Sequence, residues 1–217
     1  RNYLPGPHMP AIRRLSGQTQ TPVLVWDGEV IAGSATILDA LESRVPERPL
    51  LPEDPDARAE VAELRRYFDD EVGPAVRTAL FSVMIGDGGY ICRMFSEGKS
   101  PLVRGLYRAT FPLARGLIAR GNGVTDPANV ERAFGISAQA LDRVAERAGP
   151  SGQLVGETFT AADLTAAALL APLVNVDHPD MSRPKPMPEP VQAFLARWAP
   201  HPGAAWVRDQ YERFRPS

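Results

Sequence analysis

A short segment near the N-terminus, residues 19–34, constrains the fold more than any other part of the sequence. Two apolar runs, Val23–Trp26 and Val30–Ala32, lie on either side of an Asp27-Gly28 pair. An Asp-Gly pair between apolar runs is a strong local signal for a β-hairpin with a tight turn. Pro22 precedes the first run, and the peptide bond before a proline adopts the cis form at modest cost. We therefore expect a hairpin that is entered through a proline.

A helix is expected to follow the hairpin directly. Ile37, Leu38 and Leu41 are apolar at helical spacing, and Ser34 precedes them as the predicted N-cap. The N–H groups at the start of such a helix can hold a carboxylate. The segment thus predicts a site lined by backbone that binds an anion and a peptide.

The same segment resembles a known protein family. Thr21-Pro22-Val23-Leu24, the Asp27-Gly28 turn and the helix start Gly33–Leu41 are similar, in order and spacing, to the second half of the thioredoxin-like domain of the glutathione S-transferases. Each piece alone is a weak signal, and the ordered set is more specific.

A second resemblance to this family lies far downstream, at Leu154–Leu164. Thr160 is expected to cap a helix, with Asp163 as the reciprocal partner of a capping box and Phe159 and Leu164 as a hydrophobic staple. Loss of the Thr160 cap should cost about 0.5–2 kcal/mol. The motif starts a buried helix and performs no chemistry, so its value is diagnostic.

The resemblance implies an α/β thioredoxin-like N-terminal domain, here incomplete, followed by an all-α helical-bundle domain. We expect the first domain at residues 1–45, a proline-rich linker at 46–53 and the helical domain at 54–217. In the family, about one strand and one helix precede the position of Arg1, and Arg1–Leu4 resembles the tail of a strand. We expect this segment to be omitted from the sequence rather than absent, because a thioredoxin-like sheet without its central strand would leave a buried edge unpaired.

Composition narrows the function classes. The 217 residues are 44% hydrophobic and 23% charged, as in ordinary globular proteins, and the net charge of −2 gives no electrostatic case for nucleic acid. No apolar run is long enough to span a membrane, so no membrane partner is expected. The single cysteine, Cys92, excludes an internal disulfide and favours a reducing, cytoplasmic compartment. The three histidines are too scattered to predict a metal site.

The resemblance implies roles for five residues in a glutathione site. The backbone of Thr21, before Pro22, would pair with the cysteinyl part of glutathione, and Gln20 would lie near the glycyl carboxylate. Ser34 would hold the γ-glutamyl carboxylate. Gly33 departs from the family, which has Glu, Gln or Asp there to pair with the γ-glutamyl ammonium. Structural alternatives remain: Pro22 shapes the strand entry, Gln20 is an exposed loop residue and Ser34 is a plain cap.

Other candidates belong to flanking segments. Arg13 and Arg14 could border the same site, although a solvated helix face is the favoured interpretation. Tyr90, Arg93 and Tyr107 fall in the region that lines the second-substrate pocket in the family.

Two further features receive structural interpretations. Cys92 lies in an apolar segment and is expected to be buried and inert. The arginines at positions 104, 108 and 115 lie close to one helical face, and a basic amphipathic helix can bind a membrane surface. We favour the alternative that they form a solvated stripe on a helix packed into the core.

The resemblance implies a glutathione S-transferase-like enzyme that conjugates or otherwise transforms a small electrophile, with glutathione or a related thiol as co-substrate. The catalytic residue would lie upstream of Arg1. A non-catalytic binding or interaction module is the alternative, or a redox or isomerase member if the upstream residue is cysteine. By the same analogy we expect a homodimer that uses the helix from Asp54 to about Phe81.

Overall fold

The computed structural model describes residue 4 and residues 8–215, so most of the expected strand tail at Arg1–Leu4 lies outside the described residues. The chain divides into two compact units, one ending at Glu53 and the other beginning at Asp54. Each unit has its own helices, and the strands belong to the first unit.

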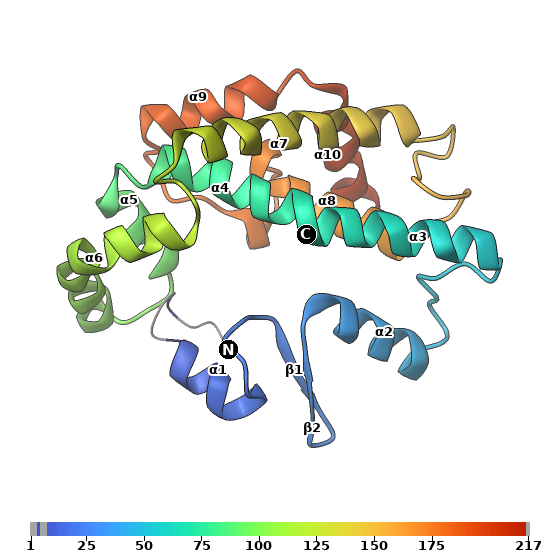
Figure 1. Cartoon of the computed structure of the whole chain (residues 1–217), viewed down its shortest axis with the longest axis horizontal. Coiled ribbons are helices and arrows are strands. Elements are labelled where there is room, and N and C mark those ends of the chain that lie inside the picture. Colours follow the sequence, from blue (N-terminus) through green and yellow to red (C-terminus); the bar gives the residue numbers. More distant parts are fainter. Residues whose placement is uncertain (1–3, 5–7, 216–217) are drawn as a thin grey trace. The chain divides into compact units, whose positions relative to one another are not determined.

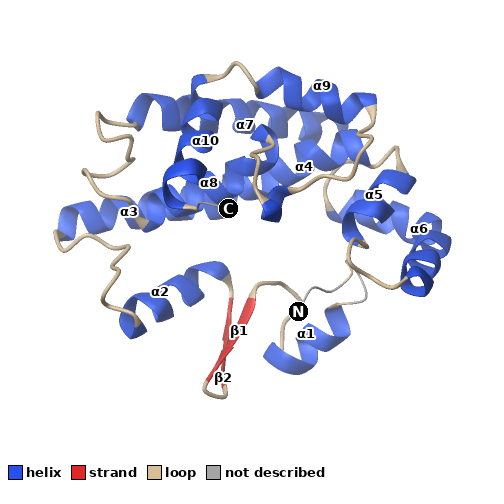
Figure 2. Cartoon of the chain, turned by 180° about the vertical axis from the view of Figure 1, so that it is seen from behind, coloured by secondary structure: helices blue, strands red, loops and turns tan. Residues whose placement is uncertain are grey.

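The N-terminal unit contains two helices and one β-hairpin (Figures 1 and 2). Its elements in chain order are α1 (Met9–Ser16), β1 (Val23–Trp26), β2 (Glu29–Ala32) and α2 (Ser34–Arg44). The strands are antiparallel, with Val23 opposite Ala32 and Trp26 opposite Glu29. The two turn residues, Asp27 and Gly28, both have positive φ angles, of 49° and 85°, as expected for an Asp-Gly hairpin turn.

The start of α2 corrects one detail of the sequence analysis. The N-cap is Gly33, with φ 95° and ψ 140°, and no side chain caps the helix. The prediction that Ser34 is the N-cap is therefore wrong by one residue: Ser34 is the first residue of α2 and is exposed. The positive φ of Gly33 strongly favours glycine, so the chain turns into the helix one residue earlier than the serine suggests.

The helical unit holds all the remaining elements (Figure 1). They are α3 (Pro55–Tyr67), η1 (Phe68–Val72), α4 (Gly73–Met84), α5 (Gly88–Phe95), α6 (Pro101–Gly121), α7 (Pro127–Arg147), α8 (Ala161–Val174), η2 (Pro179–Met181), α9 (Glu189–Trp198) and α10 (Pro202–Phe214). Between α3 and α4 lies the π-helical turn η1, directly before Gly73. Pro74 has no N–H to continue the regular ladder into that turn.

Helix α8 forms the centre of this unit, and its start is the capping box expected from the sequence. The Asp163 side chain is fully buried. Its carboxylate accepts hydrogen bonds from the backbone N–H groups of Leu154 and Thr160 and from the Thr160 hydroxyl, each at 2.8 Å. Burial raises the pKa of the Asp163 carboxyl, and these hydrogen bonds oppose that effect. The motif is thus structural.

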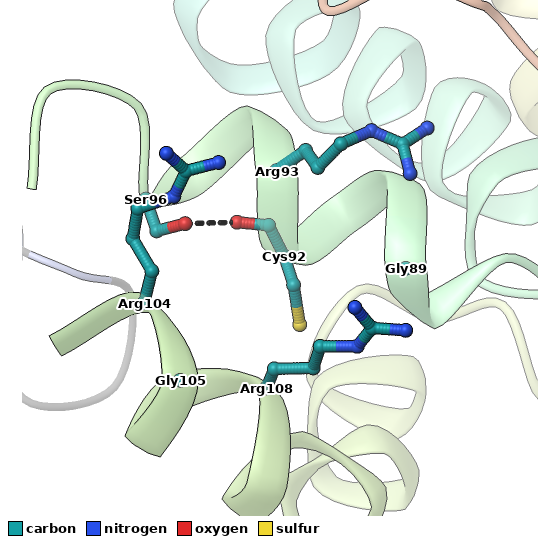
Figure 3. Close-up of a pocket in the computed structure, with 7 residues that line it drawn as sticks. All are labelled: Gly89, Cys92, Arg93, Ser96, Arg104, Gly105 and Arg108. Carbon is teal, nitrogen blue, oxygen red and sulfur yellow. Dashed lines mark hydrogen bonds between the residues drawn. The ribbon is translucent and has the colours of Figure 1, made fainter. Parts of the chain in front are cut away.

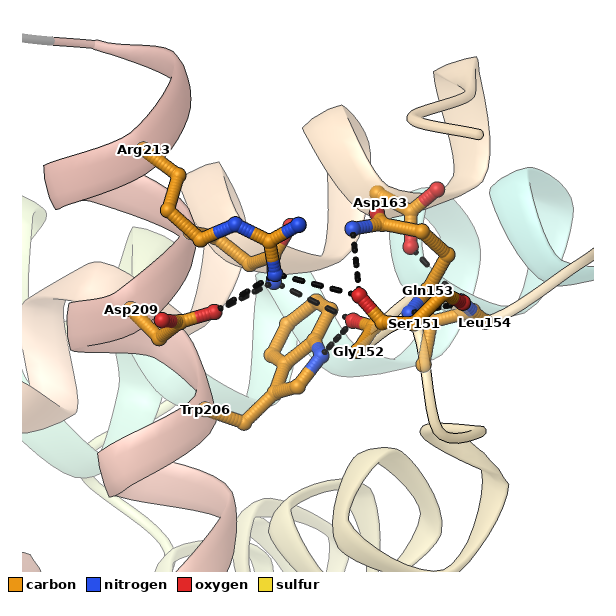
Figure 4. Close-up of polar contacts among 9 residues, drawn as sticks. Ser151, Gly152, Gln153, Leu154, Asp163, Trp206, Asp209 and Arg213 are labelled. Atoms are coloured by element: carbon orange, nitrogen blue, oxygen red, sulfur yellow. Dashed lines mark hydrogen bonds and ion pairs between the residues drawn. The ribbon is translucent and has the colours of Figure 1, made fainter. Parts of the chain in front are cut away.

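The loop before α8 is held against α10 (Figure 4). The Gly152 carbonyl accepts hydrogen bonds from Trp206 Nε1 at 2.8 Å and from Gln210 Nε2 at 3.1 Å. Arg213 Nη1 donates to the Ser151 carbonyl and contacts Asp209 Oδ2, both at 3.1 Å. These bonds to backbone carbonyls fix the loop that carries the signature motif.

Helix α6 differs from its sequence interpretation. Only Tyr107 and Phe111 of its described residues are buried. Four leucines are 65–85% exposed: Leu102, Leu106, Leu113 and Leu117. The interpretation of α6 as a helix packed into the core is therefore wrong, because most of its apolar side chains lie outside the contact with the rest of the unit.

Candidate functional site

The N-terminal unit contains a pocket of about 510 Å³ beside the hairpin. We call it the cis-proline pocket, and it is lined by Arg13, Gln18, Thr19, Gln20, Thr21, Pro22, Ala32, Gly33 and Ser34. All five residues that the resemblance assigned to glutathione are among them. The structure thus brings together residues that are up to 14 positions apart, from Gln20 to Ser34.

The hairpin explains why the two segments meet. The Thr21–Pro22 peptide bond is cis, and β1 begins at the next residue. The Gly33 N–H donates to the Pro22 carbonyl at 3.0 Å, which closes the open end of the strand pair. As a result the loop before β1 and the first residue of α2 border the same pocket.

The loop that forms the opposite wall is held by its own hydrogen bonds. Gln18 Nε2 donates to the Gln20 carbonyl at 2.7 Å, and the Gln20 N–H donates to Gln18 Oε1. Gly17, with φ 75°, ends α1, and its N–H donates to the Arg13 carbonyl at 2.9 Å. This reversal returns the chain from α1 to the hairpin and leaves Arg13 at the pocket.

The electrostatics of the cis-proline pocket favour an anion. Among the described residues that line the pocket, Arg13 is the only charged one, and none is an acid. Ser34 is the first residue of α2, where the helix dipole has its positive end. Cation and dipole together suit a ligand that carries a carboxylate.

Of the two arginines that the sequence placed at the border of this site, Arg13 lines the pocket and is exposed, whereas Arg14 is not in the lining. Gln18, Thr19 and Ala32 line the pocket without having been predicted. The predicted hairpin could have indicated Ala32, because Ala32 pairs with Val23, the residue that follows Pro22.

A second pocket lies in the helical unit, between α5 and α6. It measures about 250 Å³, and we call it the arginine pocket; it is lined by Gly89, Cys92, Arg93, Ser96, Arg104, Gly105 and Arg108 (Figure 3). Of the three residues expected at a second-substrate pocket, only Arg93 lines it.

The two tyrosines, Tyr90 on α5 and Tyr107 on α6, belong to the same helix pair but do not line this pocket. Tyr90 is fully buried. Burial lowers the pKa of Arg183, and the Tyr90 hydroxyl opposes that effect. Tyr107 is 7% exposed, and its hydroxyl has no hydrogen-bond partner among the described residues. Burial raises the pKa of Tyr107, with a smaller contribution from Cys92.

Cys92 is buried, as the sequence predicts. Burial raises the pKa of its thiol, and the nearby Arg108 guanidinium opposes this shift. Within residues 8–215, no group of three or more His, Cys, Asp and Glu side chains is arranged to hold a metal ion. No helix in the described part of the chain is both long and apolar enough to cross a membrane.

Comparison with known proteins finds similarity to the glutathione S-transferases. Residues 1–49 match the family model of the glutathione S-transferase N-terminal domain. The fold is similar to that of the beta-etherase LigF from Sphingobium sp. strain SYK-6, with 20% identity, a TM-score of 0.58, and coverage of 94% of this chain and 83% of that one. It is also similar to a glutathione S-transferase from Rhodospirillum rubrum F11, with 21% identity, a TM-score of 0.56, and coverage of 95% and 72%. No curated protein matches the chain.

The N-terminal residues thus match the glutathione S-transferase N-terminal domain, and the fold as a whole is similar to that of these proteins, with a thioredoxin-like N-terminal domain followed by an all-helical domain.

Proposed function

We propose that this protein binds glutathione or a closely related thiol in the cis-proline pocket and transfers it to a small electrophile. One observation carries the proposal: a single pocket joins the backbone at Thr21-Pro22, the start of α2 at Ser34 and the cation Arg13. In a peptide thiol with carboxylates at both ends, the peptide backbone can pair with the backbone at Thr21-Pro22, and the carboxylates can interact with the start of α2 and with Arg13.

Each part of glutathione has a proposed partner. The extended backbone at Thr21 pairs with the cysteinyl segment, and Pro22 shapes that edge. Ser34 and the positive end of α2 hold the γ-glutamyl carboxylate. Gln20 lies near the glycyl carboxylate, and Arg13 supplies the positive charge of the pocket.

Gly33 limits how the ligand is recognised. It has no side chain to pair with the γ-glutamyl ammonium, and its φ of 95° disfavours a residue that could. None of the described residues lining the pocket is an acid. The amino group of the ligand is therefore expected to contribute little to affinity.

The proposed chemistry is stabilisation of the thiolate followed by its attack on the electrophile. A donor that lowers the thiol pKa is expected upstream of Arg1. Proximity to the bound electrophile and the lowered thiol pKa together would supply the rate.

Calorimetric titration of the full-length protein with glutathione tests the proposal. Saturable binding is expected, and Ser34→Ala should weaken it about tenfold, because a hydrogen bond to a charged group is lost. Ser43→Ala is the matched control: Ser43 lies on the same helix, is exposed and donates to the Ala40 carbonyl at 3.0 Å. Equal affinities for the two variants would contradict the assigned role of Ser34.

The same titration tests the role of Gly33. A glutathione analogue without the γ-glutamyl amino group should bind as tightly as glutathione itself. A large loss of affinity would show that another residue reads the ammonium.

A non-catalytic binding or interaction module is the second candidate, and the missing acid at Gly33 favours it. Such a module would give no turnover with any electrophile. If the residue upstream of Arg1 is cysteine, turnover is measured as thiol-disulfide exchange instead of as conjugation to an electrophile. We also propose that the protein is a homodimer in the cytoplasm.

A further inference from the structure

The arginine pocket has no part in the function proposed above. It lies wholly in the helical unit, and its walls come from two neighbouring helices, α5 and α6. Three of its seven lining residues are arginines, and no lining residue is an acid.

The positive charge of this pocket is not neutralised by its surroundings. Arg104 and Arg108 form no ion pair with the described residues. Arg93 donates to the Pro186 carbonyl at 3.4 Å and lies over the Tyr90 ring at 5.8 Å, contacts that leave its charge in place. Helix α6 itself contains four arginines and no acidic residue.

One carboxylate close to the pocket, that of Asp87, caps a helix. A Cβ atom built on Gly89 would lie 3.3 Å from Asp87 Oδ1, so Asp87 is close to one end of the pocket. Asp87 caps α5, and its Oδ1 accepts the Tyr90 N–H at 2.8 Å. The Asp87 carboxylate thus caps the start of α5 at one end of the pocket. Arg104 and Arg108 belong to the other helix, α6.

The pocket is also shaped to admit a ligand. Gly89 and Gly105 contribute no side chain, and a Cβ atom on Gly105 would meet no other atom within 4 Å. Cys92 and Ser96 form a buried wall, 4% and 2% exposed. Figure 3 shows the Cys92 thiol directed from α5 towards α6, beside Arg108.

The Ser96 hydroxyl donates to the Cys92 carbonyl, so this hydroxyl proton is already used within the wall of the pocket. The donors that remain at the rim of the pocket are the guanidinium groups.

We propose that the arginine pocket binds a small oxyanion, in the form of a carboxylate, sulfate or phosphate group. Guanidinium groups match the planar or tetrahedral oxygens of these anions with paired, charge-assisted hydrogen bonds. A volume of about 250 Å³ admits the anion with a small organic body. The source is either a free inorganic anion or an acid group on a small organic molecule.

Cys92 provides a built-in reporter, because it is the only cysteine in the sequence and lines the pocket. The rate at which a small neutral reagent such as methyl methanethiosulfonate labels Cys92 is measured in the full chain, with sulfate or benzoate replacing chloride at constant ionic strength. Saturable protection of the thiol is expected. A bound anion blocks access and also disfavours the thiolate.

Two arginine variants make the test specific. Arg104→Gln should weaken the protecting anion about tenfold, because one charge-assisted contact is lost. Arg115→Gln is the matched control: it removes an exposed arginine from the same helix, and Arg115 does not line the pocket. Calorimetric titration with the same anions gives a second readout that does not depend on access to the thiol.

Protection by both anions supports a general oxyanion site, and protection by benzoate alone assigns the site to an organic acid. Absence of binding by calorimetry and of protection would overturn the proposal, as would equal effects of Arg104→Gln and Arg115→Gln. Ser34→Ala, which tests the thiol site, should leave this protection unchanged, so the two proposals fail separately.

Discussion

Gly203 lies at a close approach between two helices of the helical unit, α10 and α7. A Cβ atom there would lie 2.1 Å from the backbone carbonyl oxygen of Leu141, on α7. Real Cβ atoms do not approach backbone so closely, and a backbone carbonyl cannot move aside as a flexible side chain can. Glycine at this position is therefore required by the packing of α10 against α7.

Gly203→Ala is accordingly expected to destabilise the protein by at least the ~1–3 kcal/mol typical of overpacking. Gly135→Ala is the control, since a Cβ atom there meets nothing within 4 Å on the exposed face of α7. That change should stabilise the helix by roughly 0.5–1 kcal/mol. Chemical denaturation measures both, and equal midpoints would contradict the close approach.

At the scale of elements, α6 is the unusual helix. Its exposed leucines follow one another at positions 102, 106, 113 and 117, and the arginines of the pocket lie on another part of its surface. Only Tyr107 and Phe111 anchor it by burial. Stability should therefore depend little on the leucines of α6 and strongly on the buried Leu141 of α7.

Leu113, which is 85% exposed, supplies the test. Leu113→Ala should change the free energy of unfolding by no more than about 0.5 kcal/mol, as at other surface positions. Leu141→Ala, at a fully buried position on α7, should cost about 2–5 kcal/mol. If both variants lose similar stability in thermal or denaturant unfolding, a contact in solution covers Leu113.

At the scale of the whole molecule, the proposed homodimer uses the segment that is now seen as α3, η1 and α4. Light scattering at micromolar concentration should give twice the chain mass of 23.6 kDa. Arg77 is exposed on α4, and Arg77→Glu should shift the protein towards monomer, because reversing a charge inside an interface is costly. A monomeric unmodified protein would refute the dimer.

The sequence predicts much of the fold because many of its signals are local. The Asp27-Gly28 turn depends on the backbone angles of its own two residues, and the Thr160 capping box depends on side chains that contact backbone a few residues away. Such contacts form whatever the rest of the chain does. They also carried the resemblance to the glutathione S-transferases, which the family comparison confirms for the N-terminal domain.

The candidate site was only partly predictable for the same reason. Gln20, Thr21, Pro22, Gly33 and Ser34 were named from the motif, but the presence of Arg13 in the lining depends on how α1 returns to the hairpin. The displaced cap at Ser34 has a related cause, since the backbone angle at Gly33 decides where the helix begins.

Local signals in the sequence were therefore enough to predict the hairpin, the buried cap of α8 and the resemblance to the glutathione S-transferases. The exposure of the α6 leucines and the meeting of Arg93, Arg104 and Arg108 at one pocket could be seen only in the folded chain. The physical reason is range: turns and caps are set by neighbours along the chain, whereas burial and pocket lining are set by the packing of one helix against another.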